Sequence, residues 1–203
     1  YIADYSTDRA IDFIKTHRDE PFFCYVPYNP PHSPFQVPDA YFNKYKAKGL
    51  DDRLACVYAM CENLDDNIAR LLNTLDDMEL SDDTIVIFIT DNGPNGKRYN
   101  GDMRGSKGSP HEGGSRVPCF IRWPNGIEAG TMIEPISAHI DLLPTLVDLL
   151  RLPKPDTLPL DGVSLAPLLD NPDVDWPDRI ICGHWGWAGS ARSQTHRLVV
   201  KGD

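Results

Sequence analysis

Three polar segments of the chain carry side chains that could act on a charged substrate. Asp91 and Asn92 follow the apolar run of residues 84–90, and their carboxylate and carbonyl oxygens are hard ligands of the kind that Ca²⁺ or Mg²⁺ prefers. His32 lies in the segment PPHSP, where its imidazole could donate to an anionic ester oxygen or assist a leaving group. Lys107 lies in the segment MRGSKGSPHEGG, where an ammonium group could neutralise charge on an oxyanion. Each segment is therefore a candidate part of a catalytic or metal site.

Each segment also has an explanation without catalysis. D-N-G is a favourable turn sequence, and a histidine in a proline-rich loop or a lysine in a glycine-rich loop can simply face solvent. Near Lys107, Arg104 is a second basic candidate, and His111 could donate a hydrogen bond to a primary site residue. Glu112 is expected to cap backbone amides or to pair with Arg116. Asp65 could reach a neighbouring loop or lie on a solvated helix face.

Composition narrows the class of protein. The chain has 203 residues, of which 41% are hydrophobic and 25% charged, as is ordinary for one globular α/β domain. Its net charge of −10 argues against a partner bound through a phosphate backbone, such as nucleic acid. No apolar stretch is long enough for a membrane span. The five cysteines form no C-x-x-C pair, so we expect most of them to be small buried hydrophobes.

The elements that must position the candidates follow from hydrophobic periodicity. Apolar residues recur every three or four positions in three segments, which predicts helices over residues 4–17, 52–78 and 136–150, the last with Pro144 near its start or at a kink. Short apolar runs predict strands at 21–28, 84–90, 117–124, 180–187 and 196–203. The run at 84–90 suits a central strand covered on both faces. Strand–loop–helix alternation predicts a three-layer α/β domain, in which strand-end loops converge on one site.

Taken together, these segments resemble the sulfatase family of the alkaline-phosphatase-like superfamily. The resemblance covers nearly the whole chain, and it is carried by YNPPHSPF, VYAMCENLDDNIARLLNTL, DDTIVIFITDNG, RGSKGSPHEGGSRVPCFIRWP and SAHIDLLPTLVDLL. It implies a mixed, mostly parallel sheet between helices, incomplete in this chain. Residues 1–178 would form the middle and later part of the α/β domain, and residues 179–203 the start of a smaller C-terminal antiparallel sheet.

The resemblance also implies roles for the candidate residues. Asp91 and Asn92 are similar to two ligands of the Ca²⁺ ion that binds the sulfate group. His32 and Lys107 are similar to residues that contact the sulfate oxygens and aid departure of the alcohol. Arg192 resembles an arginine that often opens the C-terminal sheet and is given no catalytic role. The implied function is hydrolysis of sulfuric esters, with a sulfated small molecule or carbohydrate as substrate.

The chain departs from the family pattern at the nucleophile. Sulfatases make formylglycine from Cys or Ser within C/S-x-P/A-x-R, and no Cys or Ser here has that context. We therefore expect a chain that begins after the nucleophile segment, holds an incomplete Ca²⁺ site and is inactive alone, with exposed sheet edges that could support an oligomer. The family suggests a periplasmic, secreted or lysosomal location. A phosphodiester or phosphonate monoester hydrolase of the same superfamily and a non-catalytic binding protein remain alternatives.

Overall fold

The chain forms two compact units, Tyr1–Thr84 and Ile85–Asp203. The structure, a computed structural model, describes every residue except 155, 157, 158, 186, 187, 196, 202 and 203. Within the described residues, no helix is long and apolar enough to cross a membrane. Each unit is considered below by itself.

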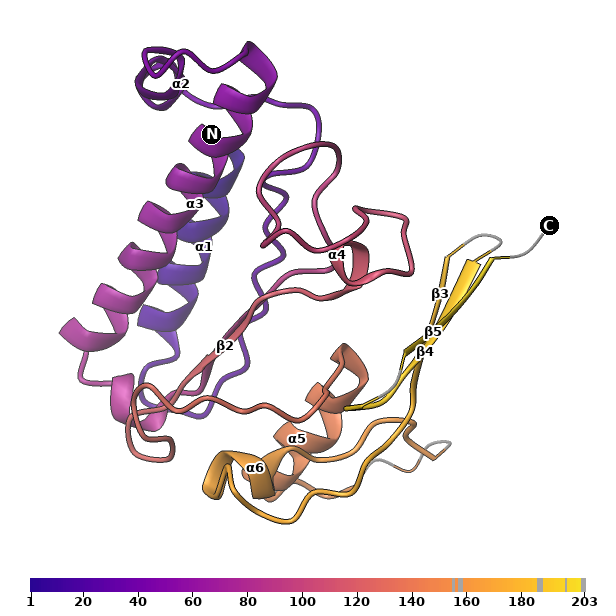
Figure 1. Cartoon of the computed structure of the whole chain (residues 1–203). Helices are drawn as coiled ribbons and strands as arrows, with labels where there is room; N and C mark the ends of the chain where they lie inside the picture. The colour runs from indigo at the N-terminus through magenta and orange to yellow at the C-terminus, as the bar shows by residue number, and fades with distance from the viewer. Residues whose placement is uncertain (155, 157–158, 186–187, 196, 202–203) are drawn as a thin grey trace. The chain divides into compact units, whose positions relative to one another are not determined.

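The first unit is helical. It contains α1 (Ile2–Thr16), α2 (Asp39–Lys46), α3 (Asp52–Asp77) and the short 3₁₀ helix η1 (Ser81–Asp83). The predicted long helix is confirmed as α3, which starts where the Asp51 carboxylate accepts a hydrogen bond from the Leu54 amide at 3.0 Å. Helix α1 packs along α3 (Figure 1), and small residues such as Ala55 and Ala59, both fully buried, allow the close approach.

A polar cluster pins α1 to α3 within this unit. Asp4 of α1 accepts hydrogen bonds from Asn63 at 2.9 Å and from Asn67 at 2.7 Å, and both asparagines are buried. Burial opposes ionisation of the Asp4 carboxyl, but the hydrogen bonds from Asn67 and Asn63 outweigh it and lower the pKa. The two helices are therefore fixed in register as well as packed.

The predicted strand at 21–28 is not a regular strand in the structure. Half-buried and exposed side chains alternate along it, as in a strand, but no partner strand among the described residues pairs with it. Its outward side chains Phe23 and Tyr25 are 75% and 77% exposed. These residues alternate as they would in a strand. A strand also needs backbone hydrogen bonds to a neighbouring strand, and the periodicity of a sequence does not reveal whether such a neighbour exists.

The second unit contains two small sheets and several short helices. Strand β1 (Val86–Ile89) pairs antiparallel with β2 (Cys119–Arg122), and β3 (Ile181–Trp185), β4 (Ala188–Arg192) and β5 (Arg197–Lys201) form an antiparallel sheet. The helices are α4 (Glu112–Ser115), η2 (His139–Asp141), α5 (Leu142–Leu149) and α6 (Ala166–Asp170). The strands predicted around β1, β2, β3 and β5 are confirmed, although the predictions at 180–187 and 196–203 extend into residues outside those described.

Three details of the sequence prediction need correction. The described strand pairs are all antiparallel, so the mostly parallel sheet is not present among the described residues. Strand β1 is half-buried at every position and pairs with β2 alone among the described strands, so it is not the fully buried central strand that was expected. The helix predicted at 136–150 begins as η2 and continues as α5, and Pro144 lies in the first turn of α5, where a proline is tolerated.

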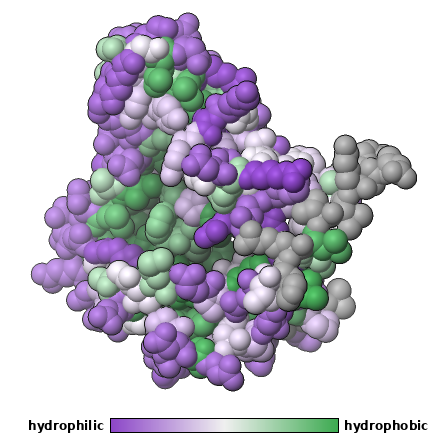
Figure 2. All heavy atoms as spheres, viewed as in Figure 1, coloured by the Kyte–Doolittle hydropathy of each residue, from purple (hydrophilic) through white to green (hydrophobic). Residues whose placement is uncertain are grey.

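Several large apolar side chains reach the surface. Figure 2 shows apolar residues exposed between more polar areas of the chain. Phe120 on β2 is 66% exposed and Ile180, just before β3, is 70% exposed. Exposed apolar side chains are consistent with the expected oligomer, which stays a prediction.

Candidate functional site

The end of β1 presents Asp91 and Asn92. The Thr90 carbonyl, one residue earlier, accepts a hydrogen bond from Nε2 of His139 at 2.8 Å. Oδ1 of Asp91 accepts from the Asn92 amide at 2.8 Å, and the Asn92 side-chain amide donates to the Gly93 carbonyl at 3.1 Å. Among the described residues, no hydrogen bond engages Oδ2 of Asp91 or Oδ1 of Asn92. Two hard oxygens on adjacent residues therefore remain available to a ligand.

The long glycine-rich loop after β1 closes back on the strand end. The Gly93 amide donates to the Gly114 carbonyl at 2.9 Å, and the Lys107 amide donates to the Pro94 carbonyl at 2.9 Å. The approach at Gly93 admits no side chain, because a Cβ atom there would lie 1.9 Å from the carbonyl oxygen of Gly113. These two backbone bonds bring Lys107 next to the Asp91–Asn92 strand end, although sixteen positions separate Lys107 from Asp91 in the sequence.

The predictions around Lys107 have mixed outcomes. Pairing of Glu112 with Arg116 is confirmed, with a separation of 3.8 Å between carboxylate and guanidinium. His111 caps α4 through its backbone, and its carbonyl accepts from the Gly114 amide at 2.9 Å. The proposed hydrogen-bonding role of the His111 ring stays a prediction, as does any role of the exposed Arg104.

The C-terminal sheet contacts the loop that contains Lys107, which is called the lysine loop below. Arg192, at the end of β4, donates from its guanidinium to the Pro110 carbonyl. This contact joins residues that are 82 positions apart, so the local sequence around Arg192 carried no signal of it. Arg192 therefore supports the loop that contains Lys107, within the second unit.

A buried ion pair anchors η2 near the strand end. Asp141 is fully buried, and its carboxylate accepts hydrogen bonds from both terminal nitrogens of the Arg179 guanidinium, with 2.7 Å between Oδ1 and Nη1. It also accepts from the amides of Ala138 at 2.7 Å and Val163 at 2.9 Å. Burial opposes ionisation of Asp141, but the hydrogen bonds from Arg179 and the two amides outweigh it and lower the pKa of the carboxyl.

The ion pair between Asp141 and Arg179 also bears on His139, which contacts the end of β1. Because η2 begins with His139, the ion pair at Asp141 restrains the backbone of the residue whose imidazole bonds to the Thr90 carbonyl. His139 lies within the segment 136–150 that the sequence predicts to be helical. The structure shows it exposed and hydrogen-bonded to the backbone 49 positions away.

His32 lies in the first unit, and Asp91, Asn92 and Lys107 lie in the second. His32 is exposed, and its amide donates to the Asn29 carbonyl at 2.9 Å. Its Nδ1 lies 2.8 Å from the Ser33 carbonyl, which can only accept, so Nδ1 carries a proton and Nε2 is the atom left for a substrate. Asp65, the other candidate of this unit, is exposed on α3.

The side-chain oxygens of Asp91 and Asn92 are of the chemical type that binds a hard divalent metal. Asp91 and Asn92 supply two oxygens, whereas Ca²⁺ takes about six to eight. Among the described residues there is no group of three or more His, Cys, Asp or Glu side chains that could hold a metal ion. The assignment of Asp91 and Asn92 as metal ligands therefore stays a prediction.

Known proteins resemble the chain over most of its length. The sequence profile of the sulfatase family matches residues 2–152, and that of the C-terminal region of N-sulphoglucosamine sulphohydrolase matches residues 107–203. An N-acetylgalactosamine-6-O-sulfatase of Bacteroides thetaiotaomicron is 35% identical over 169 residues, which cover 76% of this chain and 32% of that protein.

Solved structures give the same fold. The crystal structure of Ps i-CgsB in complex with k-i-k-neocarrahexaose has a TM-score of 0.79 and 27% identity, and covers 98% of this chain and 48% of that one. A phosphonate monoester hydrolase from Silicibacter pomeroyi, at 18% identity and a TM-score of 0.67, covers 96% of this chain and 50% of that one, and shows the fold alone.

The chain thus spans about a third to a half of the length of these relatives. The alkaline-phosphatase-like α/β fold expected from the sequence is confirmed, and the family implies a divalent metal. The match to the family profile extends over most of the chain and includes the strand end, the lysine loop and the proline-rich histidine loop. The chain therefore belongs to the sulfatase family.

Proposed function

We propose that the protein containing this chain hydrolyses sulfate esters. The observation that supports the proposal is the hydrogen bond from the Lys107 amide to the Pro94 carbonyl, which joins the backbone at Lys107 to a residue two positions after Asn92. A metal ligand pair and an ammonium group at one strand end are suited to an anionic ester whose charge grows on an oxygen during the reaction.

Each residue then has a stated task. Asp91 and Asn92 would hold a divalent metal, for which Ca²⁺ is our proposal because both ligand atoms are hard oxygens. When bound, such an ion supplies positive charge to the sulfate oxygens. Lys107 adds a second positive charge there, and His32 places a proton at the ester oxygen as the alcohol departs. The proposal assigns no nucleophile to this chain, because none of its Cys or Ser residues lies in C/S-x-P/A-x-R.

For the substrate we propose a sulfated carbohydrate. The names of two relatives support this class: one is an N-acetylgalactosamine-6-O-sulfatase, and one was crystallised with a neocarrahexaose. A phosphodiester or phosphonate monoester is the second candidate substrate. No contact among the described residues favours it, and the phosphonate monoester hydrolase shares the fold alone.

Replacement of Lys107 by alanine in the intact protein is expected to lower kcat/KM for an aryl sulfate about 100- to 1,000-fold, as loss of one preorganised charge-stabilising group does elsewhere. Sulfate release at saturating divalent metal is the measurement. Lys97→Ala is the matched control, because Lys97 is exposed in the same loop. Equal rates for the wild type and Lys107→Ala would show that Lys107 does not contribute to catalysis at this site.

A further inference from the structure

The indole of Trp185 lies over the backbone next to Lys107. Trp185 is the last residue of β3, and a Cβ atom added to Gly108 would lie 3.1 Å from Nε1 and 3.5 Å from Cε2 of its ring. The ring and the backbone of Gly108 are therefore in direct contact. Gly108 follows Lys107 in the sequence, so the contact lies one residue from the proposed charge-stabilising group.

A second contact joins the same sheet to the same loop. The Arg192 guanidinium donates to the carbonyl of Pro110, two positions after Gly108. Trp185 pairs with Ala188, the first residue of β4, whereas Arg192 is the last residue of that strand. The two contacts therefore come from opposite ends of the paired strands, and the lysine loop is held at two points.

Both contacts come from one face of the sheet. Residues opposite each other in an antiparallel pair share a face, as do alternate residues along a strand. Trp185 lies opposite Ala188, and Ser190 and Arg192 follow Ala188 at intervals of two. Ser190, which lies between the two contacts on this face, is buried. The face that carries Trp185 and Arg192 is thus a covered face, and the lysine loop contacts it at both ends.

The backbone around Lys107 needs such restraint. Gly105 and Gly108 have φ angles of +92° and +83°, in a region that glycine visits freely and at a large cost in conformational entropy on ordering. On one side, the Lys107 amide is fixed by its hydrogen bond to the Pro94 carbonyl at 2.9 Å. On the other side, the contact of Gly108 with Trp185 limits where the chain can go.

Core packing does not account for Trp185. The residue is 55% exposed, so its ring contributes only part of the stabilisation that a fully buried aromatic side chain provides. Its partner on β4, Ala188, offers a single methyl group for it to pack on. A large aromatic side chain that is half in solvent, at the end of a short strand, is instead well placed to restrain the loop that it contacts.

We propose that Trp185 is a positioning residue for Lys107, which it restrains through the backbone of Gly108. The inference rests on the proposed function, which assigns the ammonium group of Lys107 to the sulfate oxygens. A charge stabilises a developing oxyanion only when it is held in place, and a displacement of about 1 Å can cost about 100-fold in rate. Trp185 contacts neither substrate nor metal in this scheme.

The kinetic test is a double-mutant cycle in the intact protein, with an aryl sulfate at saturating divalent metal. Trp185→Ala is expected to lower kcat/KM about 10- to 100-fold in the wild type, and Trp185→Phe by less. In Lys107→Ala the same change should cost no more than about twofold, because the side chain that Trp185 positions is already absent. An equal loss in both backgrounds would overturn the proposal, since Trp185 would then act independently of Lys107.

The matched control for this cycle is Trp123→Ala. The Trp123 ring also lies against a glycine, Gly126, which is outside the lysine loop. Loss of an indole there is expected to leave kcat/KM for the aryl sulfate near the wild-type value. A loss as large as that of Trp185→Ala would contradict a specific role of Trp185.

A methyl group on Gly108 tests the contact from the other side. Gly108→Ala forces the indole to shift and also strains a positive φ. Gly101→Ala is the control, because Gly101 has a φ of +68° but the nearest side-chain atom to an added Cβ would be 3.9 Å away. Gly108→Ala should lower kcat/KM more than Gly101→Ala, and this difference should shrink in Trp185→Ala. An undiminished difference would contradict the role of the indole.

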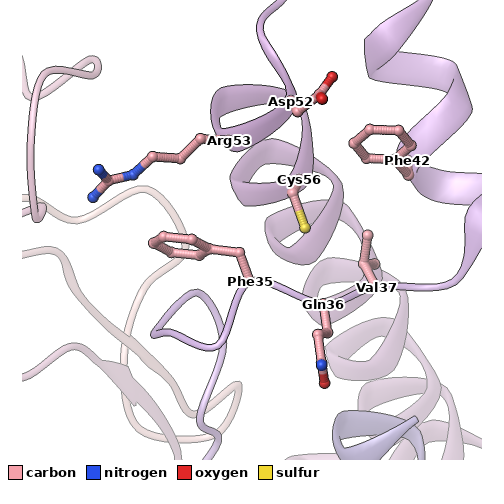
Figure 3. A pocket seen from close by; sticks show the side chains of 7 residues that line it. All are labelled: Phe35, Gln36, Val37, Phe42, Asp52, Arg53 and Cys56. Carbon is pink, nitrogen blue, oxygen red and sulfur yellow. The ribbon is translucent and has the colours of Figure 1, made fainter.

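Limited proteolysis tests the restraint without any turnover. Trypsin cleaves after lysine and arginine, and the early products of the intact protein give the rate of cleavage after Lys107 relative to that after Lys97, which is exposed in the same loop. Trp185→Ala is expected to raise this ratio about 10-fold, because cleavage requires local opening of the chain. Phe42→Ala, in the wall of a concavity of the first unit (Figure 3), controls for general destabilisation and should leave the ratio unchanged.

The two readouts separate this inference from the proposed function. A ratio raised by Trp185→Ala in a protein that releases no sulfate would support the restraint and contradict the proposed function alone. A working sulfatase in which Trp185→Ala leaves both the cleavage ratio and kcat/KM unchanged would overturn the role of Trp185 alone.

Discussion

Replacement of His32 by alanine in the intact protein is expected to slow hydrolysis of a sugar sulfate about 100- to 10,000-fold, the range that general acid catalysis contributes. Hydrolysis of an aryl sulfate with a strongly acidic phenol should slow much less. The reason is the leaving group: a sugar alkoxide needs a proton as the ester bond breaks, whereas an acidic phenolate departs without one. Because Nδ1 of His32 donates to the Ser33 carbonyl, the proton for the leaving group has to come from Nε2 of the imidazolium form, in which both ring nitrogens are protonated.

The measurement is kcat/KM for a series of aryl and alkyl sulfates of increasing leaving-group pKa. For His32→Ala, the logarithm of kcat/KM should fall more steeply with leaving-group pKa than for the wild type. His17→Ala is the control, since the His17 ring contacts the end of its own helix through Nδ1, 2.8 Å from the Phe13 carbonyl. Parallel lines for wild type and His32→Ala would show that His32 does not protonate the leaving group.

Replacement of Asp141 by alanine is expected to lower the free energy of unfolding by about 3–5 kcal/mol, which is the typical cost of removing one partner of a buried ion pair. The variant leaves the Arg179 guanidinium without its carboxylate, and the side chain of Arg179 is 17% exposed. It also leaves the amides of Ala138 and Val163 without an acceptor. Chemical denaturation of the purified protein is the measurement.

The pH dependence of stability provides a second measurement for the Asp141→Ala prediction. Because the folded-state pKa of Asp141 is lowered, its contribution is fully present above the unfolded pKa of about 3.9 and is lost as the pH falls through the folded value. The stability difference between the wild type and Asp141→Ala should therefore shrink below about pH 4. Asp148→Ala, on an exposed position of α5, is the control. A change of less than about 0.5 kcal/mol in Asp141→Ala, the usual effect of a surface substitution, would contradict the account.

The long helix and the polar strand end could be predicted from the sequence because their signals are local. Apolar residues along α3 recur at the helical period over many turns, and an apolar run followed by Asp91 and Asn92 marks a strand that ends in polar side chains. The glycines around Lys107 likewise indicated a loop. These features need no information about distant parts of the chain.

The remaining features depend on partners that are far away in the sequence. The segment at 21–28 alternates like a strand but lacks a described neighbour, and β4, with the sequence AGSAR, has no apolar run yet pairs on both sides. Arg179 meets Asp141 across 38 positions, and Arg53 lies over a phenylalanine from another segment. Local periodicity contains no information on such pairs, which tertiary packing determines.

The measurement that tests the central claim most directly is the ratio of kcat/KM for an aryl sulfate to that for an aryl phosphodiester, determined on the intact wild-type protein with divalent metal. A sulfate site built from Asp91, Asn92 and Lys107 predicts sulfate release with the aryl sulfate as the better substrate. Preferred hydrolysis of the phosphodiester, with no sulfate released, would contradict it.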